Sequence, residues 1–67
     1  MSVAKVTEIS ATSEKSFEDA VIQGITRASK TLKGIRSAWI KEQRVDVSDG
    51  RPKSFQVNMK VTFVLNE

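Results

Sequence analysis

The stretch that decides the fold is Phe55-Gln56-Val57-Asn58-Met59-Lys60-Val61-Thr62-Phe63-Val64-Leu65. Its odd-numbered residues are all apolar, and its even-numbered residues are polar except for Val64. Successive side chains of a strand point to opposite faces, so this alternation predicts a strand with one apolar face on a core. The pattern is typical of an antiparallel sheet that is covered on one side only.

A tight turn comes before this strand, at Ser48-Asp49-Gly50-Arg51-Pro52. Asp-Gly between two strand patterns is a strong hairpin signal, because Gly tolerates a positive φ. The preceding strand is predicted to begin near Arg36. Ala38 and Ile40 share one of its faces, and the other face is predicted to carry Ser37, Trp39, Lys41 and Gln43.

The apolar parity changes later in that strand. Val45 and Val47 are the apolar pair there, and their parity is opposite to that of Ala38 and Ile40. A bulge inserts one extra residue into a strand and so reverses its parity. We therefore expect a bulge near residues 42–44.

One amphipathic helix is predicted at residues 16–33. Ser16 is a suitable N-cap, and the acids Glu18 and Asp19 suit the positive end of a helix. The apolar residues then follow three-to-four spacing, at Phe17, Ala20, Val21, Ile25, Ala28 and Leu32. Lys30 and Lys33 are expected to close the helix, with Gly34 as its left-handed C′ residue.

A first strand is predicted at residues 3–11, where the alternation is imperfect. The order is then strand, helix, strand, strand, which is an α+β fold within a single domain of residues 1–67. The one helix covers one face of a three-stranded antiparallel sheet. The other face has no second layer within the chain, so it must meet water, a ligand or another copy; it is predicted to carry Ser37, Trp39, Lys41, Gln43, Gln56, Asn58 and Lys60.

The composition favours a homo-oligomer. A chain of 67 residues buries little surface, and it contains no Cys or His for a disulfide or an ordinary zinc site. Residues 1–5 contain no apolar run of the kind that begins a signal peptide, and no stretch has the length of a membrane span, so we expect a cytoplasmic protein. The net charge of +3 is spread along the chain, which does not favour a nucleic-acid partner.

Catalytic chemistry is not indicated, and we predict that the chain is not an enzyme. Nucleophilic catalysis needs a nucleophile, a base and an orienting group, and the sequence contains no His and no Cys. Capping and turn formation explain the cluster of hydroxyl residues at the predicted helix start, which comprises Ser10, Thr12, Ser13 and Ser16. No metal site is predicted, although Asp46 and Asp49 flank the turn and could share a hard cation such as calcium.

Trp39 is the candidate functional residue that stands out. Its parity places it on the uncovered face, where a large aromatic is either an oligomer contact or a stacking surface for a planar ligand. Gln56 lies on the same face of the next strand. An amide both donates and accepts, so it could read the edge of a heterocycle. Both interpretations remain open at this point.

The sequence resembles the dodecins, a family of small flavin-binding proteins. The resemblance lies in the order and spacing of four segments over nearly the whole chain: residues 12–13 (Thr-Ser), 26–32 (Thr-Arg-Ala-Ser-Lys-Thr-Leu), 49–50 (Asp-Gly) and 55–63 (Phe-Gln-Val-Asn-Met-Lys-Val-Thr-Phe). It implies a sheet wrapped around its helix and a hollow homododecamer. It also implies flavin, as FMN or riboflavin, bound in pairs near two-fold axes, with Gln56 on the pyrimidine edge and Arg44 on the phosphate side.

The sequence departs from the family at the stacking position. The aromatic residue that stacks on the flavin in the family falls at Ser37, whereas Trp39 lies two residues later on the same face, about 6–7 Å away. Two hypotheses follow. In the first, the protein stores or sequesters flavin, with Ser37, Trp39, Arg44 and Gln56 as the binding residues. In the second, it is a dodecin-like shell that binds no flavin and holds a cation or another small ligand. An unrelated nucleic-acid or peptide-binding module is the third, least favoured, interpretation.

Overall fold

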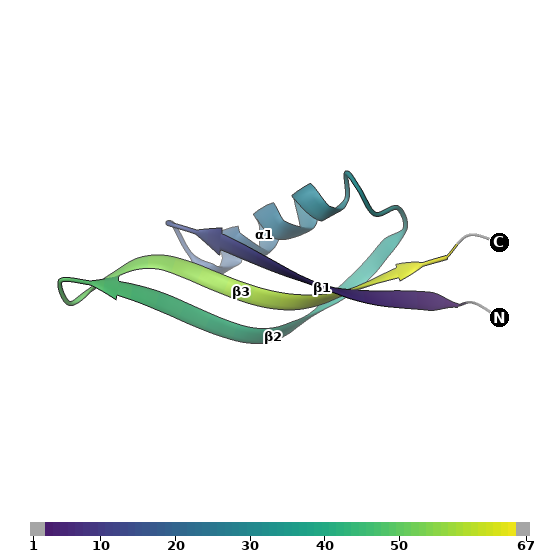
Figure 1. Cartoon of the computed structure of the whole chain (residues 1–67). Helices are drawn as coiled ribbons and strands as arrows, with labels where there is room; N and C mark the ends of the chain where they lie inside the picture. The colour runs from purple at the N-terminus through teal and green to yellow at the C-terminus, as the bar shows by residue number, and fades with distance from the viewer. Residues whose placement is uncertain (1–2, 66–67) are drawn as a thin grey trace.

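The structure, a computed structural model, describes residues 3–65. It contains four elements in the predicted order: β1 (Ala4–Ser13), α1 (Phe17–Ala28), β2 (Ile35–Ser48) and β3 (Arg51–Val64). The strands form one antiparallel sheet in the order β1-β3-β2 (Figure 1). The predicted α+β fold with a three-stranded antiparallel sheet is confirmed.

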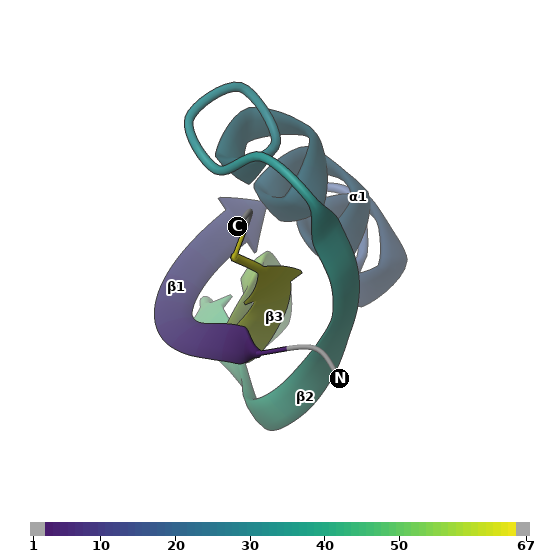
Figure 2. The same cartoon turned by 90° about the vertical axis from the view of Figure 1, so that its right-hand side faces the viewer.

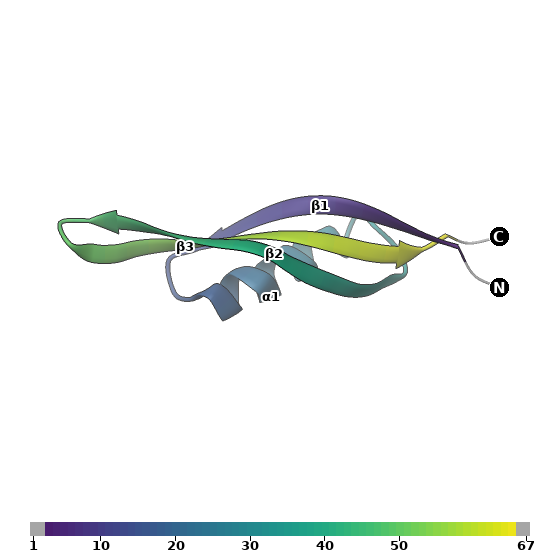
Figure 3. The same cartoon turned by 90° about the horizontal axis from the view of Figure 1, so that it is seen from below.

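The alternating stretch forms the central strand, β3. Val57, Met59 and Val61 are fully buried on the side that faces the helix. Figure 3 shows α1 on one side of the sheet, and the β2–β3 hairpin extends past the end of the helix. End-on, β1 and β2 curve on either side of β3 (Figure 2). A strand between two neighbours and under a helix has no free edge, which explains why its pattern was so regular.

The core is small and lies between α1, β1 and β3. Ala20 of the helix and Val57 and Met59 of β3 are its buried centre. Apolar residues that are partly buried pack around them, namely Ile9, Ala11, Phe17, Val21 and Ile25. Phe17 and Phe55 meet edge to face, with ring centroids 5.1 Å apart, an arrangement that aromatic pairs favour.

The helix begins as predicted but ends earlier. The Ser16 hydroxyl accepts a hydrogen bond from the backbone N–H of Asp19, which confirms Ser16 as the N-cap. The helix ends at Ala28, with Ser29 as its C-cap, so Lys30 and Lys33 lie beyond it. The backbone N–H groups of Lys30 and Thr31 donate to the carbonyls three residues earlier, and these tighter bonds end the α-helical ladder. Gly34, with a φ of +78°, leads into β2 and does not cap the helix.

The hairpin turn is confirmed, and the bulge lies one residue earlier than predicted. Asp49 and Gly50 both have positive φ, 53° and 74°, as a two-residue turn of type I′ requires. The pairing of β2 with β3 shifts between Ile40 and Glu42, not within residues 42–44. Because the bulge falls at Lys41, the prediction for Gln43 was wrong: Gln43 pairs with Val57 and so lies on the helix side of the sheet.

The first strand is longer than predicted, since it ends at Ser13 and not at Ala11. The assignment of Ser10 and Thr12 to the helix start was therefore wrong: both lie in β1, where they pair with Asn58 and Gln56. Period-two alternation from Glu8 onward places both on the polar side of the sheet, a signal that was present in the sequence.

Candidate functional site on the open face of the sheet

The face of the sheet that points away from α1 is called the open face here. Each pair of directly opposite residues in an antiparallel sheet shares a face, so the strand register assigns its members. Gln56 is opposite Thr12 and Arg44, Asn58 is opposite Ser10 and Glu42, and Lys60 is opposite Glu8 and Trp39. Ser37, opposite Thr62, belongs to the same face. All four predicted binding residues therefore lie on the open face.

The side-chain amide of Gln56 is at the centre of a polar network. Its Oε1 accepts a hydrogen bond of 2.5 Å from Nη2 of Arg44. Its Nε2 donates to Oγ of Ser10 at 2.9 Å and to Oδ1 of Asn58 at 3.3 Å. Asn58 in turn donates from Nδ2 to Oε1 of Glu42 at 3.0 Å. The structure thus brings together Arg44 and Gln56, which were predicted, with Ser10, which was not.

Arg44 connects this network to the hairpin. Its Nε lies 3.5 Å from Oδ1 of Asp46, and two thirds of the Arg44 side chain is exposed. Its guanidinium group has five N–H donors, so it keeps donors for an anion or a carbonyl from outside the chain. A shallow hollow of about 280 Å³ lies beside it, lined by Glu42, Gln43, Arg44, Gln56 and Asn58.

At the suggested cation site near the turn, protein groups already contact the carboxylate of Asp46 that would bind the cation. Oδ2 of Asp46 accepts a hydrogen bond of 2.9 Å from Ser54, and its other oxygen lies beside Arg44. Among residues 3–65, no cluster of three or more His, Cys, Asp or Glu side chains could hold a metal ion. The Asp46 carboxylate is thus engaged by protein groups, including a cation of the chain itself.

Trp39 and Ser37 lie at the other end of the open face. Trp39 is 60% exposed and opposite Lys60, which is four residues from Gln56 along β3. At roughly 3.3 Å per residue, about 13 Å separates the two positions. The four predicted residues therefore form two groups, one polar around Gln56 and one around the exposed indole ring. An ion pair of 3.4 Å between Lys41 and Glu8 lies on the same face.

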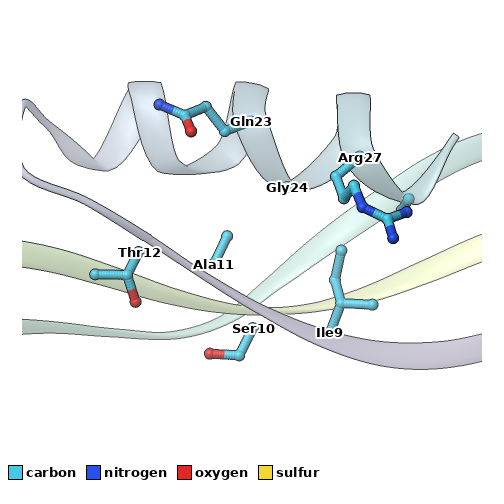
Figure 4. A pocket seen from close by; sticks show the side chains of 8 residues that line it. Ile9, Ser10, Ala11, Thr12, Gln23, Gly24 and Arg27 are labelled. Carbon is cyan, nitrogen blue, oxygen red and sulfur yellow. The ribbon is translucent and has the colours of Figure 1, made fainter. Parts of the chain in front are cut away.

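A second hollow, of about 390 Å³, lies on the opposite side of the sheet between α1 and β1. Figure 4 shows Ile9 and Ala11 pointing toward the helix at this groove, whereas Ser10 and Thr12 point away from it. None of the predicted binding residues lines this groove. The candidate site is therefore the open face.

No helix in residues 3–65 has the length and apolarity needed to cross a membrane.

Comparison with known proteins gives consistent matches over the whole fold. A family model described as Dodecin matches residues 3–66. A dodecin from Thermus thermophilus is 35% identical over 65 residues, which cover 97% of this chain and 94% of the relative. The structure of a dodecin from Streptomyces davaonensis matches with a TM-score of 0.94 at 38% identity, over 98% of this chain and 97% of that one. A calcium dodecin from Mycobacterium tuberculosis, solved with a calcium-binding site, matches with a TM-score of 0.82 at 30% identity, over 96% and 91% of the two chains.

Proposed function

The chain belongs to the dodecin family, and from that premise we propose that it binds flavin, as riboflavin or FMN, and stores or sequesters it in a homododecamer. Membership of the family makes it a self-associating protein that binds a small ligand. The observation that carries the flavin proposal is the pairing of the Gln56 amide with the exposed Arg44 guanidinium on the sheet face opposite α1, which no part of residues 3–65 covers (Figure 3).

The chemistry of this pair suits a flavin. The pyrimidine edge of the isoalloxazine ring presents carbonyl groups and an N–H, which an amide and a guanidinium can pair with. Arg44 also provides a positive charge for the phosphate of FMN. Trp39 offers a wide exposed ring on which a planar heterocycle can stack. In the proposed complex, Trp39 stacks on the ring, whereas Gln56 and Arg44 pair with the polar groups of the ligand.

The separation of about 13 Å between Trp39 and Gln56 favours a site that two copies complete. In such a site, the ring stacks on Trp39 of one copy and meets Gln56 of another. The open face is then both the ligand site and part of an interface, as expected of a sheet face with no second layer of its own. A flavin held there contributes binding energy to the assembly as well.

Exposed apolar residues on the helix side of β2 support self-association. The helix packs mainly against β1 and β3, so it leaves part of β2 uncovered. Ile40 and Val45 face that side and are 44% and 40% exposed. Isolated apolar residues are ordinary on a surface, but a core of this size gives a short chain little stability by itself. Contacts between copies are the remaining source of stabilisation.

The proposed role is binding and not catalysis. A stacked indole quenches the excited state of a flavin, so a flavin held against Trp39 is protected from photochemistry while it is stored. No proton transfer or covalent step is needed for this role. The residues of the chain only position the ring and pair with its polar edge.

The test is a fluorescence titration of riboflavin and of FMN with the purified oligomer. Trp39 is the only Trp of the chain, so the emission of ligand and protein can be followed separately. We expect both signals to be quenched at a fixed stoichiometry of flavin to protomer. If neither signal changes at high micromolar protein, the flavin proposal is refuted.

A dodecin-like shell that binds no flavin is the second candidate. Ser37 favours it, because this residue stands where the stacking aromatic of the family would be expected and offers no ring of its own. In that case Trp39 anchors an interface between copies, where aromatic residues are enriched. The same titration distinguishes the two, since an interface Trp gives no saturable quenching by flavin. Isothermal titration with calcium then tests whether the shell holds a cation.

A further inference from the structure

The orientation of the Gln56 amide is fixed within the free chain. An amide group has two N–H donors and one oxygen with two acceptor sites. Both donors of Gln56 have acceptors, Oγ of Ser10 on β1 and Oδ1 of Asn58 on β3. The oxygen accepts one hydrogen bond, from Arg44 on β2. One acceptor site on the oxygen is therefore the hydrogen-bonding capacity that the Gln56 side chain has left.

The reverse orientation of the amide is disfavoured. It would point the NH₂ group at the guanidinium of Arg44, so that donors would face donors. It would also turn the oxygen toward the oxygen of Asn58, which is an acceptor. Arg44 and Asn58 thus select the same orientation. The Ser10 hydroxyl can accept or donate, so it holds the amide in place without selecting its orientation, and the three contacts come from the three strands of the sheet.

We propose that Ser10 and Asn58 are positioning residues for Gln56. Asn58 selects the orientation that leaves the carbonyl oxygen, and not the NH₂ group, available to the ligand, and Ser10 holds the amide in place. Ser10 reaches Gln56 diagonally across the β1–β3 pair, since its direct partner is Asn58. This proposal rests on the proposed function, because it concerns which edge of the ligand the same site reads. The ligand class it specifies is a heterocycle with an N–H next to a carbonyl.

The selectivity follows from the chemistry of that pair. The ligand N–H donates to Oε1 of Gln56, and the adjacent ligand carbonyl accepts from Arg44, which has unused donors. Isoalloxazine has such an edge at N3–H and its neighbouring carbonyls. A ligand with a methyl group on this nitrogen lacks the donor, so the second acceptor site of Oε1 stays unpaired while Arg44 occupies the first. A hydrogen-bonding group that is buried without its partner costs more binding free energy than the replacement of both partners by apolar groups.

The first test compares riboflavin with 3-methylriboflavin on the assembled protein, by quenching of flavin emission. We expect the wild type to bind riboflavin at least tenfold more tightly. Ser10→Ala should weaken riboflavin binding about three- to tenfold, since one hydrogen bond and its preorganisation are lost. The double variant Ser10→Ala/Asn58→Ala frees both N–H groups of Gln56, so the preference for riboflavin should fall by at least threefold.

Thr12→Val is the matched control. Thr12 lies on the same strand and faces Gln56 directly, but its hydroxyl is not bonded to the Gln56 amide, and Val keeps its shape. We expect riboflavin affinity within twofold of the wild type. Equal affinities of Ser10→Ala and Thr12→Val would overturn the proposal, as would an unchanged preference in the double variant. Far-UV circular dichroism and sedimentation of each variant separate these outcomes from loss of fold or assembly.

A ligand-free measurement separates this proposal from the flavin proposal. The side-chain NH₂ resonances of Gln56, assigned with Gln56→Ala, should shift in Ser10→Ala and remain in place in Thr12→Val. If the wild type binds no riboflavin but the resonances behave in this way, the flavin proposal fails and the positioning of Gln56 stands. If they do not respond to Ser10→Ala, the positioning proposal fails whatever the ligand.

Discussion

Trp39 of β2 lies directly opposite Lys60 of β3, on the face of the sheet that points away from α1 (Figure 3). Trp39 is 60% exposed, so more than half of the residue is in contact with solvent in the single chain. A side chain in this position contributes little to the core between α1, β1 and β3. The role of Trp39 is therefore to be sought in contacts with a ligand or with another copy.

Trp39→Ala should leave the monomer fold intact and weaken flavin binding about tenfold or more, since stacking on an aromatic is worth about 1–3 kcal/mol per ring. Trp39→Phe, which keeps an aromatic ring, is the matched control and should lose less. Circular dichroism checks the fold, sedimentation checks assembly, and quenching of flavin emission measures affinity. Unchanged assembly and unchanged affinity in Trp39→Ala would show that this residue belongs to neither contact.

Arg44→Met should lower the affinity for FMN more than the affinity for riboflavin. The guanidinium charge can pair with the phosphate, which riboflavin lacks, and a charge-assisted contact is about twice as strong as a neutral one. Riboflavin binding should fall as well, because Gln56 loses its partner at Oε1. The checked quantity is the ratio of the two dissociation constants at low salt. Arg51→Met, at the start of β3, is the control and should leave this ratio unchanged.

Gly24→Ala should destabilise the chain by about 1 kcal/mol. A Cβ at Gly24 would lie 2.8 Å from Cε of Met59 and 2.9 Å from Cβ of Ala11, which is closer than carbon atoms approach. Overpacking costs about 1–3 kcal/mol, and Ala recovers about 1 kcal/mol of helix propensity. Urea unfolding at a fixed protomer concentration measures the difference. Thr26→Ala, on the exposed side of the same helix, should be neutral or stabilising, and equal stability of the two variants would contradict the close packing.

Local patterns predicted the elements of the fold well. The alternation at residues 55–65, the N-cap at Ser16 and the Asp49-Gly50 turn each depend on neighbours in sequence, and the structure confirms all three. The predicted end of the helix was wrong, because Lys30 and Lys33 are compatible with a longer helix. The helix has to stop at Ala28 only because the chain must then turn into β2. The bulge was displaced by one residue, since a change of parity locates a bulge only approximately.

The candidate site was less predictable because it depends on pairing between strands. Periodicity assigned Ser37, Trp39 and Gln56 to one face, which the register supports. It could not place Trp39 and Gln56 about 13 Å apart, because the offset between β2 and β3 is set by the turn together with the register shifts at Ile40/Glu42 and Asp46/Val47. Ser10 was missed for a similar reason: its contact with Gln56 joins residues that are 46 positions apart.

The contact between Ser13 and Asp19 predicts how stability depends on pH. The Ser13 hydroxyl donates to Oδ2 of Asp19 at 2.6 Å, and this hydrogen bond is the main cause that lowers the pKa of the Asp19 carboxyl. Partial desolvation opposes it by raising the pKa, whereas Gln23 and the charge of Lys15 lower it further. A carboxylate with a lowered pKa stabilises the fold above the ordinary aspartate value, about 3.9, and loses that effect as the pH falls through its folded pKa.

Ser13→Ala should therefore raise the pKa of Asp19, and its loss of stability relative to the wild type should be largest at neutral pH and shrink toward pH 3. Ser16→Ala is the matched control, because the Ser16 hydroxyl accepts from a backbone N–H that does not titrate in this range. Its loss, about 1 kcal/mol for an N-cap, should be nearly constant with pH. Urea unfolding at pH 7 and pH 3 and a ¹³C titration of the Asp19 carboxyl measure both effects. Parallel stability curves for the two variants would show that the contact of Ser13 with Asp19 is not what lowers this pKa.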